Sequence, residues 1–264
     1  MSRFFKDKVI IITGSHMGIG KAIATECLKR GAKIVINGRN AERLQAAKAA
    51  FAEKGYEVLA VQADVTDYAQ CQKLVEETIE TYGKLDAIIP NASLSMESSF
   101  DKMEPDVFKR VMDSQIYGTV FPIKAALPYL KKTKGSVIIV SSAAGMFGFP
   151  DFSPYSAGKM SLTALAQSLK IEFSTFDVHV GIIYIGYTKN DSQKQILDAK
   201  GNLRPVGFRP AWIQQPQEKV ANAILRLIEK RKTRKIMSPI SKLNYFVAKY
   251  FPGFLSWILI KKRK

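Results

Sequence analysis

A tyrosine and a lysine stand four residues apart in the segment YSAGK, as Tyr155 and Lys159. In a helix, residues at this spacing leave the same face one turn apart, so a phenol and an ammonium would lie side by side. A free tyrosine ionises near pH ~10, and a neighbouring positive charge lowers that pKa because it stabilises the phenolate. Such a pair could exchange a proton with a substrate near neutral pH. The alternative is a surface pair on a helix, and the segment YFVAK repeats the spacing at Tyr245 and Lys249.

The elements that must position this pair follow an alternation of short apolar runs and helical patterns. Near-continuous apolar strands are typical of a parallel sheet that is buried on both faces. We therefore expect an α/β fold, a single Rossmann-like doubly wound parallel β-sheet flanked by helices. The expected strands are 8–13, 33–38, 57–65, 85–91, 135–142 and 178–186, and two of the intervening helices are 105–130 and 153–174.

The domain organisation is simple. Residues 1–240 are expected to form one nucleotide-binding domain, and residues 241–264 a basic, hydrophobic C-terminal extension that is amphipathic. A polar stretch with Gly and Pro, residues 188–215, interrupts the alternation. It is long for a loop without structure, so we interpret it as a lid.

A glycine-rich loop, TGSHMGIG at residues 13–20, follows the first expected strand and opens the first helix. Its glycines let the backbone turn tightly and approach a pyrophosphate, and the helix N-terminus adds free N–H groups and a positive dipole end. This strand–turn–helix context predicts a dinucleotide phosphate site. The predicted contacts are Gly14, Ser15, Gly18, Ile19 and Gly20. His16, inside the loop, either contacts a phosphate or faces solvent.

The turn after the second expected strand, INGRN, distinguishes the two nicotinamide cofactors. A carboxylate at this place would bind the ribose 2′-hydroxyl of NAD(H), whereas a basic group accommodates the 2′-phosphate of NADP(H). The turn offers Arg39 and no acidic residue. A planar guanidinium matches phosphate oxygens well, so the sequence predicts NADP(H) as the cofactor.

These residues, with four further motifs in order, give the chain its resemblance to a known family. The motifs are ADV after the third strand, PNAS after the fourth, VSSAAG after the fifth, and then YSAGK. The chain resembles the short-chain dehydrogenase/reductase family over about residues 6–236, and in particular its membrane-associated, NADP(H)-dependent members. The resemblance implies hydride transfer between NADP(H) and a carbonyl or secondary alcohol.

The resemblance also implies the catalytic residues. In the family a serine precedes the reactive tyrosine by thirteen residues, which here is Ser142, whereas Lys232 stands thirteen residues before Tyr245. Tyr155 is therefore the expected acid, with Ser142 holding the substrate oxygen and Lys159 stabilising the phenolate. The family places an asparagine forty residues before the tyrosine, where it holds a proton-relay water. Gln115 occupies that position, with the same amide on one more methylene.

Further cofactor contacts follow from the same likeness. Asp64 and Val65 would lie by the adenine, Asn91 by the ribose, and Thr188 by the nicotinamide carboxamide or a phosphate. Tyr155 and Lys159 would also touch the cofactor. The chain departs from the family where Pro90 and Ser93 flank the Asn91 motif and where Ile185–Gly186 replaces the usual Pro-Gly before Thr188.

Charge is concentrated at the C-terminus. The net charge is +17, and residues 226–264 hold twelve Lys or Arg and one Glu. No nucleic-acid-binding motif is present, so nucleic acid is not an expected partner. The tail combines Trp and Phe with Lys, which favours a helix lying in an anionic membrane interface. The alternative is a helix packed on the protein or on a partner subunit. Pro252–Gly253 should break this helix.

The remaining expectations concern the substrate, the assembly and the compartment. The resemblance implies a lipophilic ketone, such as a long-chain 3-oxo lipid, a ketosphingoid base or a steroid, and a homodimer or homotetramer. The alternative function is an NADP-binding regulatory or assembly protein with little catalysis. Cys27 and Cys71 suggest neither a disulfide framework nor a metal site. The protein is expected to be cytoplasmic and peripheral on the membrane, and the terminal KKRK resembles an endoplasmic-reticulum retrieval signal if the host is eukaryotic.

Overall fold

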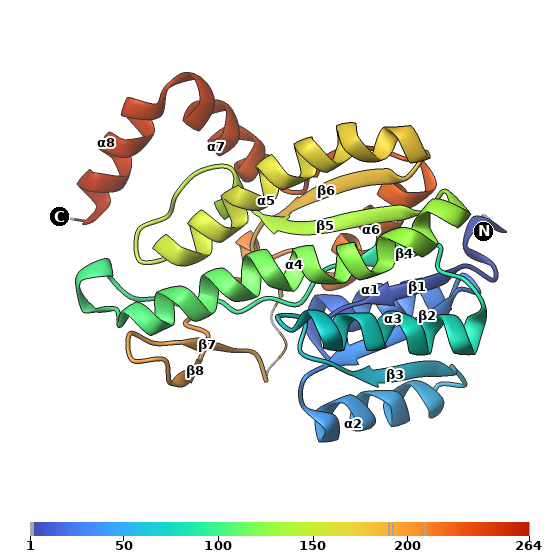
Figure 1. Cartoon of the computed structure of the whole chain (residues 1–264). Helices are drawn as coiled ribbons and strands as arrows, with labels where there is room; N and C mark the ends of the chain where they lie inside the picture. Colours follow the sequence, from blue (N-terminus) through green and yellow to red (C-terminus); the bar gives the residue numbers. More distant parts are fainter. Residues whose placement is uncertain (1–2, 190, 192, 209, 264) are drawn as a thin grey trace.

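Seven parallel strands form the centre of the protein. The computed structural model describes residues 3–189, 191, 193–208 and 210–263. The strands consist mainly of Val and Ile, whose branched side chains suit a pleated surface. Their order across the sheet is β3-β2-β1-β4-β5-β6-β9 (Figure 1). Their bounds are β1 Val9–Ile12, β2 Lys33–Gly38, β3 Val58–Gln62, β4 Ala87–Ile89, β5 Ser136–Ser142, β6 His179–Ile185 and β9 Arg234–Ile236.

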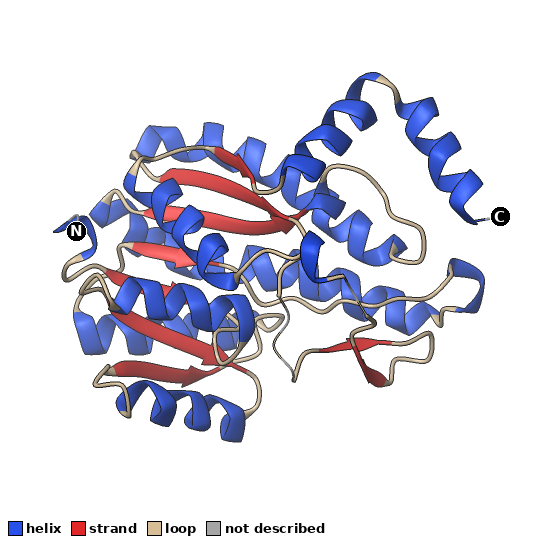
Figure 2. Cartoon of the chain, turned by 180° about the vertical axis from the view of Figure 1, so that it is seen from behind, coloured by secondary structure: helices blue, strands red, loops and turns tan. Residues whose placement is uncertain are grey.

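Helices cover both faces of this sheet, as the two opposite views show (Figures 1 and 2). Side chains alternate along β1, so Ile10 and Ile12 enter one core and Val9 and Ile11 the other. The first core receives α1 Gly18–Leu28, α2 Ala41–Ala52 and α6 Gln217–Glu229, and the second receives α3 Tyr68–Tyr82, α4 Pro105–Thr133 and α5 Ser153–Glu172. The expected doubly wound α/β fold is confirmed.

Three features differ from the expectations. A seventh strand, β9, was not foreseen because its sequence is short and basic and lacks the apolar run of a buried strand. The expected lid contains an antiparallel hairpin, β7 Gln195–Leu197 with β8 Leu203–Pro205. Helix α4 continues beyond residue 130 to Thr133, where Lys134 adopts the left-handed conformation that ends it. Short 3-10 helices lie at Arg3–Phe5, Phe100–Lys102, Ala143–Gly145, Phe173–Phe176 and Ala211–Ile213.

The C-terminal extension forms two helices, α7 Pro239–Tyr250 and α8 Pro252–Arg263, which confirms the predicted break at Pro252. Both project from the body on the side where the carboxyl ends of the strands lie (Figure 1). Their start is fixed near that edge, because a Cβ on Gly186 would meet the hydroxyls of Ser238 and Ser241 at 3.2–3.3 Å. Within the described residues, no helix is long and apolar enough to cross a bilayer.

Helices α4 and α5 approach each other closely at Gly158, inside the YSAGK segment. A Cβ added to Gly158 would lie 2.6 Å from both Cβ and Cγ of Gln115. A side chain at this position would therefore push the two helices apart. The glycine sets the distance between α5 and the helix that carries Gln115.

We predict that Gly158→Ala lowers the free energy of unfolding by about 1–3 kcal/mol, because overpacking outweighs the better helix propensity of alanine. Urea denaturation measures the change. Gly148→Ala is the matched control, since a Cβ there meets nothing within 4 Å. Equal stability of the Gly158 variant and the wild type would contradict the packing account.

Candidate active site

The glycine-rich loop connects β1 to α1 at the carboxyl edge of the sheet. Gly14 has φ +60°, and a Cβ there would lie 2.8 Å from Cα of Ala92. A Cβ on Gly20 would strike the carbonyl oxygen of Gly14 and would lie 2.7 Å from Cα of Ser15. Gly18, with φ +56°, faces open space instead. The loop is thus tightly packed on the protein side and open at Gly18, where a phosphate could approach.

Asn91 ties this loop to the end of β4. Its Nδ2 donates to the carbonyl oxygens of Thr13 and Gly14 at 3.0 and 3.1 Å. Thr13 Oγ1 in turn accepts hydrogen bonds from the backbone N–H groups of Asn91 and Ala92, both at 3.0 Å. The Asn91 amide, which was expected at the ribose, thus holds the glycine-rich loop against the neighbouring strand.

Three loop residues have side chains or backbone groups that are already engaged. Ser15 is fully buried, its hydroxyl donates to the carbonyl of Ile12 at 2.6 Å, and its N–H donates to the carbonyl of Asn37. Ile19 packs against the core between the sheet and α1. The N–H of Gly18 donates to the Asp191 carboxylate at 3.3 Å, so an acidic oxygen lies at a loop N–H group.

The expected adenosine residues meet at the ends of β2 and β3. The Arg39 guanidinium, more than half exposed, lies 3.5 Å from the Asp64 carboxylate. Although burial raises the pKa of Asp64, hydrogen bonds from Thr66 and the Arg39 charge hold that pKa below its usual value. Val65 is buried and faces Gly118 of α4. The structure therefore brings Arg39, Asp64 and Val65 to one edge, with Arg39 paired to a carboxylate.

Lys159 is buried beneath the end of β5. Its Nζ donates to the carbonyl of Val140 at 2.9 Å and lies 5.8 Å from the centre of the Tyr155 ring. Burial of the ammonium, followed by the nearby Lys194 charge, lowers the pKa of Lys159 to about 7. The expected helical face is therefore present, and it holds a cation that titrates near neutrality.

The remaining catalytic candidates lie around this lysine. Ser142 is the last residue of β5, and its Oγ accepts from the N–H of Ala144 at 3.3 Å. The next turn contacts α5 closely, because a Cβ on Gly145 would strike Ser141 Oγ and would lie 2.7 Å from the carbonyl oxygen of Lys159. This contact sets the strand that ends in Ser142 against the helix that carries Tyr155.

Gln115 is buried in α4. Its Nε2 donates to the carbonyl of Leu94 at 2.5 Å, and its Oε1 is buried without a hydrogen-bond partner in the described part of the chain. The amide therefore holds the segment after β4 and leaves one acceptor for a water or a ligand. The longer side chain fits because Gly158 leaves room for its Cγ.

Thr188 follows β6 and is buried, and its Oγ1 donates to the carbonyl of Gly186 at 3.2 Å. A backbone bridge joins it to Gln215 at the far end of the expected lid. Residues 190, 192 and 209 of that lid lie outside the described residues, as do residues 1–2 and Lys264 of the terminal KKRK. The structure places Thr188 at the same edge as the other candidates.

Sequence reasoning missed Lys194 and Asp191, both in the lid. The Lys194 charge acts on Lys159, and the Asp191 carboxylate accepts from Gly18 N–H. Both partners are far away in the sequence, and no sequence motif predicts either contact. An apolar cluster beside Tyr155 was also missed. It joins Met96, Val107 and Val111 to Leu197 of the hairpin. The segment that was expected to form a lid thus contributes charge and apolar side chains to this edge of the sheet.

Comparisons with known proteins show the family of the chain. Residues 8–201 match the short chain dehydrogenase family. The chain is 34% identical over 200 residues to 11-beta-hydroxysteroid dehydrogenase 1A of Arabidopsis thaliana, covering 74% of this chain and 57% of that protein. It is 33% identical over 181 residues to 3-ketodihydrosphingosine reductase of Bos taurus, covering 66% and 54%. The chain thus spans little more than half the length of these relatives.

Solved structures with the same fold are more distant in sequence. A short chain dehydrogenase/reductase from Burkholderia phymatum, in complex with NAD, superposes with a TM-score of 0.81 at 18% identity and covers 97% of both chains. An alcohol dehydrogenase from Thermococcus sibiricus, complexed with 5-hydroxy-NADP, gives a TM-score of 0.75 at 22% identity, over 88% of this chain and 96% of that one. At these identities the likeness concerns the fold.

We predict that Lys159→Met raises the free energy of unfolding by roughly 2–4 kcal/mol at pH 6. The native pKa of about 7 lies below the reference value of 10.5, so burying the ammonium destabilises the native state below pH 7. That penalty falls as the pH rises from 7 to 10.5, and the gain from Met should shrink with it. Urea denaturation at pH 6 and pH 9 tests this.

The control for this measurement is Lys170→Met, an exposed lysine on the same helix. It should leave the free energy of unfolding nearly unchanged at both pH values. A Lys159 variant with the same gain at pH 6 and pH 9, or with none, would contradict the buried cation.

Proposed function

The chain belongs to the short chain dehydrogenase family, and we propose that it is an oxidoreductase of alcohol and carbonyl groups that binds a nicotinamide dinucleotide. We propose that the cofactor is NADP(H) and that the physiological reaction is reduction of a lipophilic ketone. The observation that carries this proposal is the buried Lys159 ammonium beside Tyr155 at the carboxyl edge of the sheet. The same edge bears the open phosphate loop at Gly18.

The proposed chemistry assigns one role to each side chain. A bound nicotinamide supplies the hydride. The Tyr155 hydroxyl donates a proton to the substrate oxygen as negative charge grows there, and the Ser142 hydroxyl donates a hydrogen bond to the same oxygen. Lys159 stabilises the resulting phenolate through its positive charge. Gln115 holds a water on its Oε1, and that water relays protons toward Lys159.

The choice of NADP(H) rests on charge at the ribose end. Arg39 follows β2 where a carboxylate would mark NAD(H), and it already pairs with an anion, the Asp64 carboxylate. In the proposed complex Gly14, Gly18 and Gly20 approach the pyrophosphate, and Thr188 faces the nicotinamide. Asp64, Val65 and Asn91 border the adenosine.

Support for a lipophilic substrate comes from the surroundings of Tyr155. The ring packs on an apolar cluster that includes Met96 and Leu197. Large apolar side chains elsewhere in the lid are exposed, namely Leu203, Phe208 and Trp212. Two relatives carry the names of steroid and ketosphingoid enzymes. We propose a steroid, a ketosphingoid base or a long-chain 3-oxo lipid as the substrate class.

We predict that the wild type oxidises NADPH with at least one such ketone and that Tyr155→Phe lowers kcat by about 10²–10⁴ because the proton donor is lost. The Phe variant should bind NADPH as the wild type does. Absorbance of NADPH measures turnover, and Tyr245→Phe is the matched control because its phenol also lies one turn from a lysine. Tight NADPH binding with no turnover on any ketone would instead favour the regulatory or assembly function.

The C-terminal helices are proposed to contact a membrane from the cytosolic side. Eight large apolar side chains of this region are each more than half exposed: Ile240, Leu243, Phe246, Tyr250, Phe251, Phe254, Trp257 and Ile260. Lys242, Lys249 and Lys261 lie on the same two helices, which suits an anionic headgroup layer. Both helices project on the side of the active-site edge, so lipid substrates would enter from that surface (Figure 1).

We predict that Phe254→Ser with Trp257→Ser weakens partition onto vesicles containing phosphatidylserine by at least about tenfold, since two large apolar side chains are lost. Co-sedimentation measures the bound fraction. Phe100→Ser, which removes an even more exposed aromatic outside the tail, should have no effect. Unchanged partition of the double variant would overturn the membrane assignment.

Self-association is proposed to use α4 and α5. Tyr117 of α4 and Met160 and Ile171 of α5 are exposed apolar residues on helices that pack together on one face of the sheet. A homodimer or homotetramer formed through these helices would bury them.

A further inference from the structure

Residues 95–97, which follow β4, run alongside β7 of the hairpin and pair with it. The N–H of Leu197 donates to the carbonyl of Ser95 at 2.9 Å, and the N–H of Glu97 donates to the carbonyl of Leu197 at 3.1 Å. On its other side β7 pairs with β8. The hairpin is therefore joined to the segment after β4 by backbone hydrogen bonds of the kind that link parallel strands.

The turn of the hairpin is seated on the start of α4. The carbonyl of Ala199 accepts from the N–H of Glu104, the residue that precedes this helix, at 2.9 Å. Gly201 has φ +83°, and a Cβ there would lie 2.8 Å from Nη1 of Arg110 and 3.2 Å from Cγ2 of Val107. A side chain at this position would push the turn away from the helix, so the glycine allows the turn to lie close on α4.

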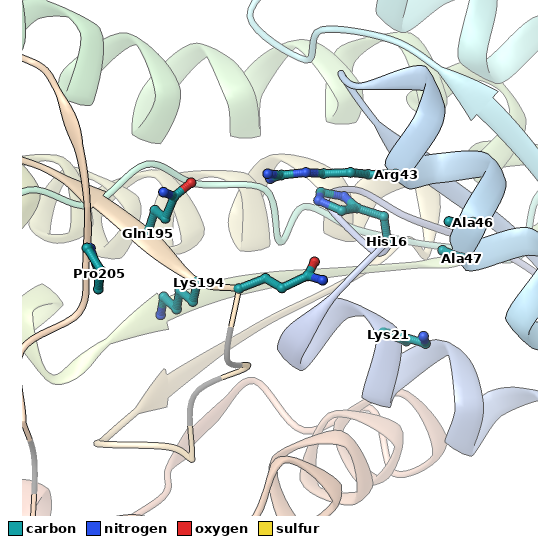
Figure 3. A pocket seen from close by; sticks show the side chains of 9 residues that line it. His16, Lys21, Arg43, Ala46, Ala47, Lys194, Gln195 and Pro205 are labelled. Carbon is teal, nitrogen blue, oxygen red and sulfur yellow. The ribbon is translucent and has the colours of Figure 1, made fainter.

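The base of the hairpin, in contrast, borders an opening. Gln195 of β7 pairs with Pro205 of β8, and both line a pocket of about 580 Å³ opposite His16 and Arg43 (Figure 3). The pocket separates this end of the hairpin from the glycine-rich loop and from α2. The position of the hairpin therefore depends on contacts at its turn and along β7.

An ion pair completes the contact along β7. The guanidinium of Arg204 in β8 lies 2.8 Å from the Glu97 carboxylate and also donates to the Glu97 carbonyl at 3.3 Å. Arg204 stands opposite Ile196 of β7, so its side chain reaches past that strand to residues 95–97. Both partners are partly exposed, which means that either can be replaced without burying a charge.

The seated hairpin determines what lies beside the tyrosine of the YSAGK segment. Met96 and Leu197 are bridged across the two paired segments, and both are buried in an apolar cluster with Val107 and Val111. The partly buried Tyr155 packs against this cluster. Because Leu197 belongs to the hairpin, a displaced hairpin would remove part of the apolar surface on which the Tyr155 ring rests.

We propose that the Glu97–Arg204 pair is a positioning contact for the active site. It holds β7 on residues 95–97, makes this part of the expected lid a fixed wall beside Tyr155, and so keeps the phenol ring in one place. The inference rests on the proposed function, which gives that phenol a proton to deliver. Glu97 and Arg204 act through the wall and touch neither the substrate nor the cofactor.

The first readout is hydrogen exchange of the full chain, followed by mass spectrometry of peptides that contain residues 195–205. Glu97→Arg and Arg204→Glu each place like charges together, so the exchange of these amides should become about threefold to tenfold faster. The double variant with both substitutions restores an opposite pair and should return the exchange rate to within about twofold of the wild type.

The second readout is turnover of a ketone that the wild type reduces. In each single variant kcat/KM for the ketone should fall about threefold to tenfold and Kd for NADPH should stay within about twofold, and the double variant should recover kcat/KM. Glu77→Arg is the matched control. It is the same substitution at a similar exposure, it breaks the Lys73–Glu77 pair of α3, and it should change neither readout.

The outcomes separate this inference from the function beneath it. Unchanged exchange in the single variants, or a double variant that exchanges as fast as they do, refutes the pair as the contact that holds the hairpin. Faster exchange with unchanged kcat/KM refutes the positioning role, because the hairpin would then move without consequence for Tyr155. A wild type that reduces no ketone refutes the proposed function, whereas the exchange rates still decide whether the pair holds the hairpin.

Discussion

The active-site edge depends on one buried hydrogen bond, from Nζ of Lys159 to the carbonyl of Val140 at 2.9 Å. An ammonium in this place is costly, and its lowered pKa reports that cost. The fold tolerates it because β5 and α5 are held together by close contact at Gly145, where a Cβ would strike both elements. The buried ammonium that costs stability is thus also the group that the proposed chemistry requires.

A second constraint holds the cofactor side of the same edge. Asn91 and Ala92, which follow β4, donate hydrogen bonds to the hydroxyl and carbonyl oxygens of Thr13, which follows β1, so the glycine-rich loop cannot move independently of the sheet. The charge around this loop is mainly positive, from Arg39, Arg43 and the lid lysines, with Asp191 as the acidic exception at Gly18. Geometry and charge together favour an anionic, phosphate-bearing ligand at the loop.

Much of this arrangement is predictable from the sequence, because it follows from local patterns. The Val and Ile runs of β1 and β5 are buried on both faces, and the Tyr155–Lys159 spacing lies on a helix as expected. The glycine-rich loop leads into α1, as the local pattern of a strand, a turn and a helix predicts. The break at Pro252 follows from the missing N–H of proline and needs no tertiary information.

What the sequence could not supply are contacts made between distant segments. The inward hydroxyl of Ser15, the loop-tying role of Asn91 and the space that Gly158 leaves for Gln115 all depend on neighbours brought close by folding. Strand β9 was not predicted because its basic segment has no strand pattern of its own and is stabilised by pairing with β6 at the sheet edge. The pocket of His16 and Arg43 joins a loop, a helix and the lid, so no single motif contains it.

A crystal structure with NADP⁺ bound tests the central claim most directly. The account predicts that the Tyr155 hydroxyl faces C4 of the nicotinamide and that the Lys159 ammonium lies within hydrogen-bonding distance of the nicotinamide ribose. A dinucleotide seated away from the loop at Gly18, or a Tyr155 hydroxyl turned from the nicotinamide with Lys159 bonded to the Val140 carbonyl alone, would contradict it.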